Sequence, residues 1–80
     1  MNKKIEPGLY KHYKNMFYHV IDSARHSETL EDMVVYRALY GAGEIWVRPL
    51  GMFLENVEID GKLQKRFEFI GKEIPDSLST

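Results

Sequence analysis

The stretch Met33-Val34-Val35-Tyr36-Arg37-Ala38-Leu39-Tyr40 decides between a strand-rich and a helical fold for this chain of 80 residues. Its β-branched and aromatic side chains are typical of a strand. A helix is the competing interpretation, because Thr29-x-x-Asp32 could form a capping box and apolar residues from Leu30 to Ala38 match a helical stripe. We predict a strand, since the adjacent Val34 and Val35 would lose χ1 freedom in a helix.

Strand-like stretches lie on both sides of this segment. Upstream, Gly8 to Tyr13 and Met16 to Ile21 alternate in the way of half-buried strands. Downstream, Gly41-Ala42-Gly43 provides a tight loop into Glu44 to Arg48. That run ends at Pro49, because proline cannot donate a hydrogen bond to a strand ladder. The middle of the chain is therefore predicted to be consecutive short strands.

The last third of the chain predicts a helical turn, a hairpin turn and a last strand. Pro49 to Phe53 suits a single helical turn, Asp60-Gly61 is a hairpin turn pair, and Phe67 to Ile70 form a last strand. Five or six short strands joined by tight turns favour an all-β fold, a small SH3-like barrel with short helical turns. We place this single domain at residues 8–70, after a lead-in at 1–7 and before a flexible tail at 71–80.

The amino-acid composition limits which binding partners and which cellular compartment we expect. Eleven Lys and Arg against twelve Asp and Glu give a net charge of −1 and a pI near 6.3, so nucleic acid is an unlikely partner. Cysteine is absent, which excludes disulfides and thiolate metal sites and suits a reducing compartment. No apolar run is long enough to span a bilayer, and the N-terminus has no signal-peptide pattern. We expect a cytoplasmic protein that does not bind membranes.

Four motifs resemble those of a known family. They are Pro7-Gly8-Leu9-Tyr10-Lys11-His12-Tyr13-Lys14, Ala24-Arg25-His26-Ser27-Glu28-Thr29, Val34-Val35-Tyr36-Arg37-Ala38-Leu39-Tyr40-Gly41 and Trp46-Val47-Arg48-Pro49-Leu50-Gly51-Met52-Phe53. In this order the chain is similar to a bacterial family catalogued as domain of unknown function 1653, although Lys65 stands where that family often has proline. The resemblance implies a free-standing cytoplasmic bacterial domain with an SH3-like barrel, and it implies no activity. The polar residues shared with the family pattern are Tyr10, His12, Tyr13, Arg25, His26, Ser27, Glu28, Thr29, Tyr36, Arg37 and Arg48.

The segment Arg25-His26-Ser27-Glu28-Thr29 is the first candidate site. His26 beside Glu28 could act as an acid–base pair or supply two ligands of a metal. The structural alternative is that Glu28 holds an arginine while His26 and Ser27 bond the loop backbone. Histidines recur at 12, 19 and 26, a spacing that fits no zinc site, and no cysteine is available. We therefore predict neither a metal nor a cofactor.

Arginines and aromatic residues form the second group of candidates. Buried charge needs a partner, so we expect Arg25, Arg37 and Arg48 to converge with Glu28 in one polar cluster suited to a carboxylate or phosphate. Tyrosines could dock peptides or stack on bases. Trp46 lies between Ile45 and Val47, which favours a core position.

The function predicted from these features is that of a non-enzymatic binding module. Its ligand would be a peptide or a small anionic, nucleotide-like molecule, and homo-oligomers are possible. The alternative is a small hydrolase-type or metal-dependent enzyme centred on His26 and Glu28; an RNA-binding barrel is disfavoured by the balanced charge. The predicted ligand-binding residues are Arg25, His26, Glu28, Arg37, Arg48, Tyr10, His12 and Tyr36.

Overall fold

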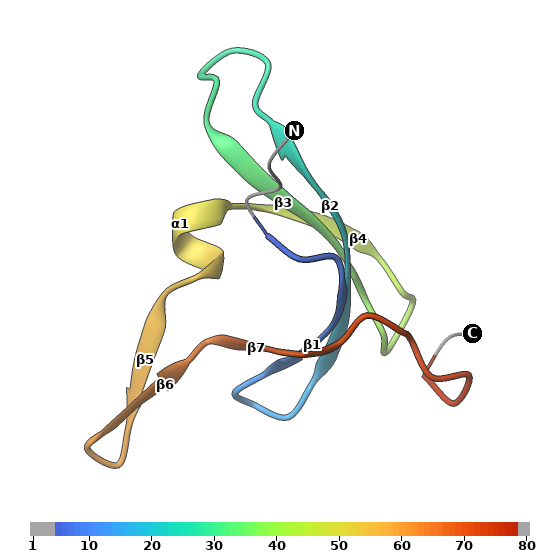
Figure 1. Ribbon diagram of the computed structural model, residues 1–80, viewed down its shortest axis with the longest axis vertical. Helices are drawn as coiled ribbons and strands as arrows, with labels where there is room; N and C mark the ends of the chain where they lie inside the picture. Colours follow the sequence, from blue (N-terminus) through green and yellow to red (C-terminus); the bar gives the residue numbers. More distant parts are fainter. Residues whose placement is uncertain (1–4, 79–80) are drawn as a thin grey trace.

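A computed structural model describes residues 5–78 as seven strands and one turn of helix (Figure 1). In chain order these are β1 (Gly8–His12), β2 (Phe17–Arg25), β3 (Asp32–Ala38), β4 (Ile45–Pro49), α1 (Leu50–Phe53), β5 (Asn56–Ile59), β6 (Lys62–Lys65) and β7 (Phe67–Gly71). The stretch from Met33 to Ala38 is therefore a strand, as predicted, and so is the final segment.

Five of the strands form one antiparallel sheet in the order β4-β3-β2-β1-β7. The remaining two, β5 and β6, pair only with each other and extend away from the larger sheet as a hairpin (Figure 1). The mostly-β prediction is confirmed, although the described residues form seven strands where five or six are predicted. In the described part of the chain β4 and β7 are the two edges of an open sheet and are not paired with each other, so no closed barrel is found.

Two short elements follow the predicted local chemistry. Helix α1 is the single turn expected after Pro49, whose φ of −55° suits the residue before a helix. The hairpin between β5 and β6 turns at Asp60 and Gly61, with φ values of 53° and 79°. Positive φ at both central residues defines the turn that matches the twist of a two-stranded ribbon.

Strand alternation gives the five-stranded sheet an inner and an outer face. On β3, Val34 and Tyr36 face inward and are buried, whereas Arg37 points outward and is exposed. The inner face packs around Phe53 of α1, which is 1% exposed and stacks on Phe67 with ring centroids 4.0 Å apart. The buried core cluster consists of Ile5, Tyr10, Tyr18, Val20, Val34, Tyr36, Ala38, Phe53 and Phe67.

The prediction that Trp46 belongs to the core is wrong, because Trp46 is 51% exposed. Ile45 and Val47, its neighbours on β4, are exposed to a similar or greater extent. The reason is the position of β4 at the edge of the sheet, where no further described strand covers it.

The first residue of β1 lies in close contact with the backbone at the end of β7. Gly8 has φ of 142°, and a Cβ at this position would collide with the carbonyl oxygen of Gly71 and lie 3.0 Å from the Cα of Lys72. Before it, Ile5 is buried and the Tyr10 hydroxyl donates to the Glu6 carbonyl at 2.7 Å.

Nothing in the described residues forms a helix that is long and apolar enough to cross a membrane.

Candidate functional site

A small pocket opens on the inner face beside β4. It has a volume of about 260 Å³ and is lined by Tyr18, Tyr36, Tyr40, Trp46 and Arg48. Strands β2, β3 and β4 each contribute at least one of these residues, because Tyr18, Tyr36 and Trp46 lie on the same face of neighbouring strands. We refer to these five residues as the tyrosine pocket.

Two tyrosine hydroxyls of this pocket bond to each other. The Oη atoms of Tyr18 and Tyr40 lie 2.7 Å apart, and the two rings meet edge to face with centroids 5.5 Å apart. Burial raises the pKa of Tyr18, and the hydrogen bond to Tyr40 raises it further. The Tyr18 hydroxyl therefore stays neutral at ordinary pH and can both donate and accept a hydrogen bond.

Arg48 provides the positive charge of the pocket. Its Nε donates to the Tyr36 hydroxyl at 3.2 Å, and its guanidinium carbon lies 5.8 Å from the centre of the Phe67 ring. Within residues 5–78 it forms no ion pair with a carboxylate. A half-buried arginine without a carboxylate leaves donors available for an outside anion.

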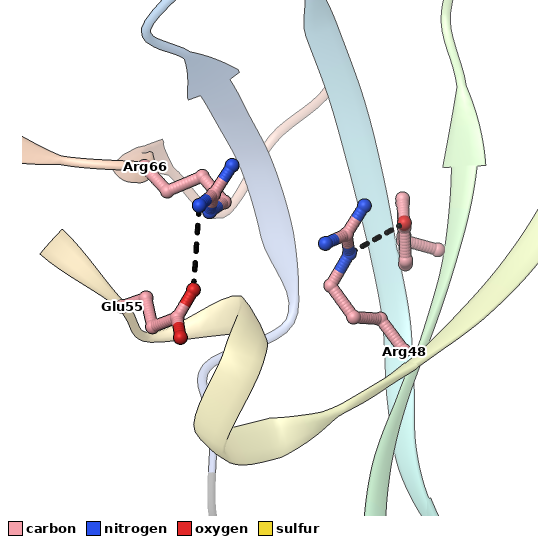
Figure 2. A network of polar contacts seen from close by, with 4 residues as sticks. Arg48, Glu55 and Arg66 are labelled. Carbon is pink, nitrogen blue, oxygen red and sulfur yellow. Dashed lines mark hydrogen bonds and ion pairs between the residues drawn. The ribbon is translucent and has the colours of Figure 1, made fainter. Parts of the chain in front are cut away.

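A second arginine, Arg66, comes directly before β7 and, like Arg48, acts on His12. The Arg66 guanidinium contacts the Glu55 carboxylate at 3.3 Å, and the Arg66 backbone N–H donates to the Glu55 carbonyl at 3.0 Å. Figure 2 shows the Arg66–Glu55 pair on one side of the view and Arg48 on the other. The Nε of Arg66 is buried and has no hydrogen-bond partner.

His12 on β1 shares this electropositive environment. Its ring packs on Tyr13 and on Phe67, at centroid distances of 4.5 and 4.8 Å. Burial lowers the pKa of His12 first, and the positive charges of Arg66, Lys14 and Arg48 lower it further. The Nδ1 atom accepts a hydrogen bond from the Lys14 backbone N–H at 3.1 Å, which suits a neutral imidazole.

We expect the domain to lose stability in mild acid because of His12. Since its folded-state pKa lies below the ordinary value of 6.5, the unfolded chain binds the proton more readily. The His12 contribution should be complete above pH 6.5 and disappear as the pH falls through the folded-state pKa. Urea unfolding between pH 5 and pH 8 measures this trend, and a His12→Gln variant should flatten it. A His12 pKa at or above 6.5, read from its NMR titration, would contradict the expectation.

The remaining predicted site residues lie elsewhere. Arg37 is on the outer face of β3 and donates to the Gly43 carbonyl at 2.8 Å, so it cannot share a site with Arg48 on the inner face. Arg25 is exposed at the end of β2, and Glu28 is exposed in the following loop. The predicted cluster of three arginines with Glu28 is therefore wrong, because strand alternation separates Arg37 from Arg48.

His26 is held by its own loop. Its Nδ1 accepts hydrogen bonds from the backbone N–H groups of Glu28 at 3.1 Å and Thr29 at 3.3 Å. The Leu30 N–H closes the turn on the His26 carbonyl at 2.9 Å, with Leu30 at a positive φ of 63°. These contacts match the structural alternative for His26, which organises the β2–β3 loop.

Two further features of the described residues bear on the choice of site. A larger pocket of about 510 Å³ lies on the outer face between the Gly41–Gly43 loop and the segment containing Ile74 and Leu78. Its arginine, Arg37, already donates to a carbonyl within the chain. Residues 5–78 bring together no group of three or more His, Asp or Glu side chains that could hold a metal ion. The tyrosine pocket is thus a site whose arginine has no carboxylate partner within residues 5–78.

Comparison with known proteins identifies the family. The model of a family described as a protein of unknown function, DUF1653, matches residues 8–69. A crystal structure of a DUF1653 protein from Bordetella bronchiseptica is 35% identical, with a TM-score of 0.80, over 91% of this chain and 96% of that one. None of the curated proteins matches the chain. The chain therefore belongs to the DUF1653 family.

Proposed function

We propose that the domain is a non-enzymatic binding module that takes a small anionic, nucleotide-like ligand in the tyrosine pocket. The observation that carries this proposal is Arg48, which lines the pocket and has no carboxylate partner within residues 5–78. The planar fork of a guanidinium binds carboxylate and phosphate oxygens in pairs.

The rest of the pocket suits a flat group next to that anion. Trp46 is half exposed and offers a ring face, on which a base can stack. The Tyr18 and Tyr40 hydroxyls supply neutral hydrogen-bonding groups. At about 260 Å³ the pocket is slightly smaller than the usual ligand site of about 300–1,000 Å³, which favours a mononucleotide or a smaller molecule over a long peptide.

An enzyme centred on His26 and Glu28 has less support. The ring nitrogen Nδ1 of His26 is occupied by backbone donors, and both side chains are exposed on a loop. General acid–base catalysis needs a group positioned beside a bound substrate. Neither residue lines the tyrosine pocket or the larger pocket on the outer face.

The SH3-like barrel belongs to the same proposal. Arg48 of one edge strand approaches the Phe67 ring of the other edge strand, so the sheet curls around its core. In this interpretation α1 fills the gap between β4 and β7, and the tyrosine pocket opens beside that gap. Ligand sites at the mouths of small barrels are common.

Titration with adenosine 5′-monophosphate and with inorganic phosphate tests the proposed site. Trp46 is the single tryptophan of the chain, so its fluorescence and indole NMR signal report directly on the pocket. We expect both anions to shift the signals of residues around Arg48 and to raise the pKa of His12, and we expect Arg48→Ala to weaken binding at least about tenfold.

The matched control is Arg37→Ala, which removes an arginine from the outer face of the same sheet and should leave the titration unchanged. Equal titration of the Arg48→Ala variant and the unmodified protein would contradict the proposal. If the protein binds phosphate but the Trp46 signals do not change when the nucleotide is added, the base does not stack on Trp46. That part of the proposal would then be wrong.

A further inference from the structure

Strand β4 exposes an open backbone edge. Among the described strands it pairs with β3 alone, in the register Val35 with Val47 and Tyr36 with Trp46. The Ala38 N–H donates to the Glu44 carbonyl at 2.9 Å. Because bonded and non-bonded pairs alternate in an antiparallel ladder, residues 44, 46 and 48 bond to β3.

The backbone groups of Ile45 and Val47 consequently point away from β3. Each offers one N–H and one C=O to an incoming strand. The backbone nitrogen of Pro49 also points away from β3. The absence of an N–H at this residue therefore removes no hydrogen bond from the β3–β4 ladder. The side chains of Ile45 and Val47 are 51% and 61% exposed. This is a free, apolar strand edge of the kind that pairs with another chain.

The sequence of this edge is complementary to itself. When two copies of β4 run antiparallel with Trp46 opposite Trp46, Ile45 lies opposite the other copy's Val47. That register joins the four outward backbone groups of each strand to the four of the other. A register centred on Val47 would instead place Ile45 opposite Pro49 and lose a donor.

Charge supports the same register. Glu44 and Arg48 are each two residues from Trp46, so each would lie opposite the other residue in the second copy. They would form non-hydrogen-bonded pairs, in which side chains are closest. Within residues 5–78 neither Glu44 nor Arg48 has an ion-pair partner. Pairing of two copies would form two ion pairs, each between Glu44 of one copy and Arg48 of the other.

The opposite edge of the sheet is less suited to pairing. The β1–β7 ladder shifts register between Leu9 and Tyr10, which marks a bulge beside the edge strand β7. A bulge twists an edge away from further pairing. The β3–β4 ladder runs through its five pairs without a shift.

We propose that two copies of this chain associate through antiparallel pairing of their β4 strands about a two-fold axis at Trp46. The two sheets would join into one, with both tyrosine pockets on the same face. Glu44 of each copy would then approach Arg48 of the other, so a second copy and an anion compete for Arg48. A single short strand pair buries less than a standard interface, which predicts weak and reversible association.

Sedimentation velocity in phosphate-free buffer, between about 10 µM and about 1 mM, tests this proposal over the range of weak association. We expect a concentration-dependent dimer, and at least about tenfold weaker association for Glu44→Lys and for Arg48→Glu, because each places like charges opposite each other. An equimolar mixture of the two variants should restore the dimer, since both cross-strand pairs are then opposite in charge. A monomer at every concentration, or a Glu44→Lys variant that associates like the unmodified protein, would overturn the proposal.

A register-specific cross-link covers the case in which Arg48→Glu does not fold. Because the chain has no cysteine, a single Trp46→Cys substitution places two thiols at the two-fold axis. Directly opposed residues of a non-hydrogen-bonded pair have Cα atoms about 4.5 Å apart, within the range of a disulfide. Ile45→Cys is the matched control, with the same 51% exposure but no opposing copy of itself. With oxidised glutathione, Trp46→Cys should form covalent dimers at least about tenfold faster; equal rates would overturn the proposed register.

Discussion

Phe53→Ala is expected to lower the free energy of unfolding by about 3–5 kcal/mol, the usual cost of truncating a buried phenylalanine. Phe53 is 1% exposed and stacks on Phe67, and its ring also meets Tyr10 and Tyr36 edge to face at centroid distances of 5.5 and 5.4 Å. It is the residue by which α1 closes the core. Small domains have about 5–15 kcal/mol of stability in total, so this change removes a large share. Urea unfolding followed by circular dichroism gives the difference directly.

The control for this substitution is the preceding residue of the same helical turn. Met52 is 47% exposed, so Met52→Ala should change the free energy of unfolding by less than about 1 kcal/mol. A similar loss in both variants would show that α1 itself, rather than the Phe53 ring, holds the core together.

Gly8→Ala is expected to destabilise the domain by about 2–4 kcal/mol, through backbone strain combined with a steric collision. The φ of 142° at Gly8 is a conformation that residues with a Cβ rarely adopt. The added methyl group would also meet the Gly71 carbonyl oxygen, and this neighbour is backbone that cannot rotate away. Relief of the collision would push β7 from β1. Thermal melts and amide NMR shifts along β7 measure both effects.

Gly51→Ala provides the matched comparison. Gly51 lies in α1 without a positive φ, and an added methyl group would meet nothing within 4 Å. Alanine at this position should therefore stabilise the domain by about 0.5–1 kcal/mol. If both substitutions prove neutral, the chain crossing at Gly8 is looser than its geometry implies.

The local elements could be predicted from the sequence because their signals are local. Adjacent valines at 34 and 35 favour a strand over a helix, and Asp60-Gly61 predicts a hairpin turn. Trp46 could not be placed in this way. Its apolar neighbours are typical of a core strand, yet they line an edge, and only the order of strands in the sheet distinguishes the two.

The residues of the site could be predicted only in part, because local signals do not show which strands are neighbours. Arg48, Tyr36 and His12 were selected from the family pattern, and the structure gathers them on the inner side. Arg37 and Arg48 are predicted to share one cluster, but they lie on opposite faces of the sheet. Arg48 pairs with Val34 and so lies on the buried face, whereas Arg37 lies between buried residues of β3 and points to the other face. Only the pairing of β3 with β4 reveals this difference. Arg66 is not among the predicted site residues, and Tyr18 and Tyr40 are only two of several candidate aromatic residues. Their approach depends on contacts between distant segments that no spacing along the chain reveals.

The β5–β6 hairpin standing apart from the larger sheet gives the chain a place to be lengthened. Its strands pair only with each other, and the Arg66–Glu55 contact ties its base to the start of β7. Residues inserted at the Asp60-Gly61 tip would extend into solvent, and the entropy of closing a longer loop grows only slowly with its length. A reporter peptide or an affinity tag grafted at this tip would therefore remain clear of the core, of the tyrosine pocket and of the β4 edge.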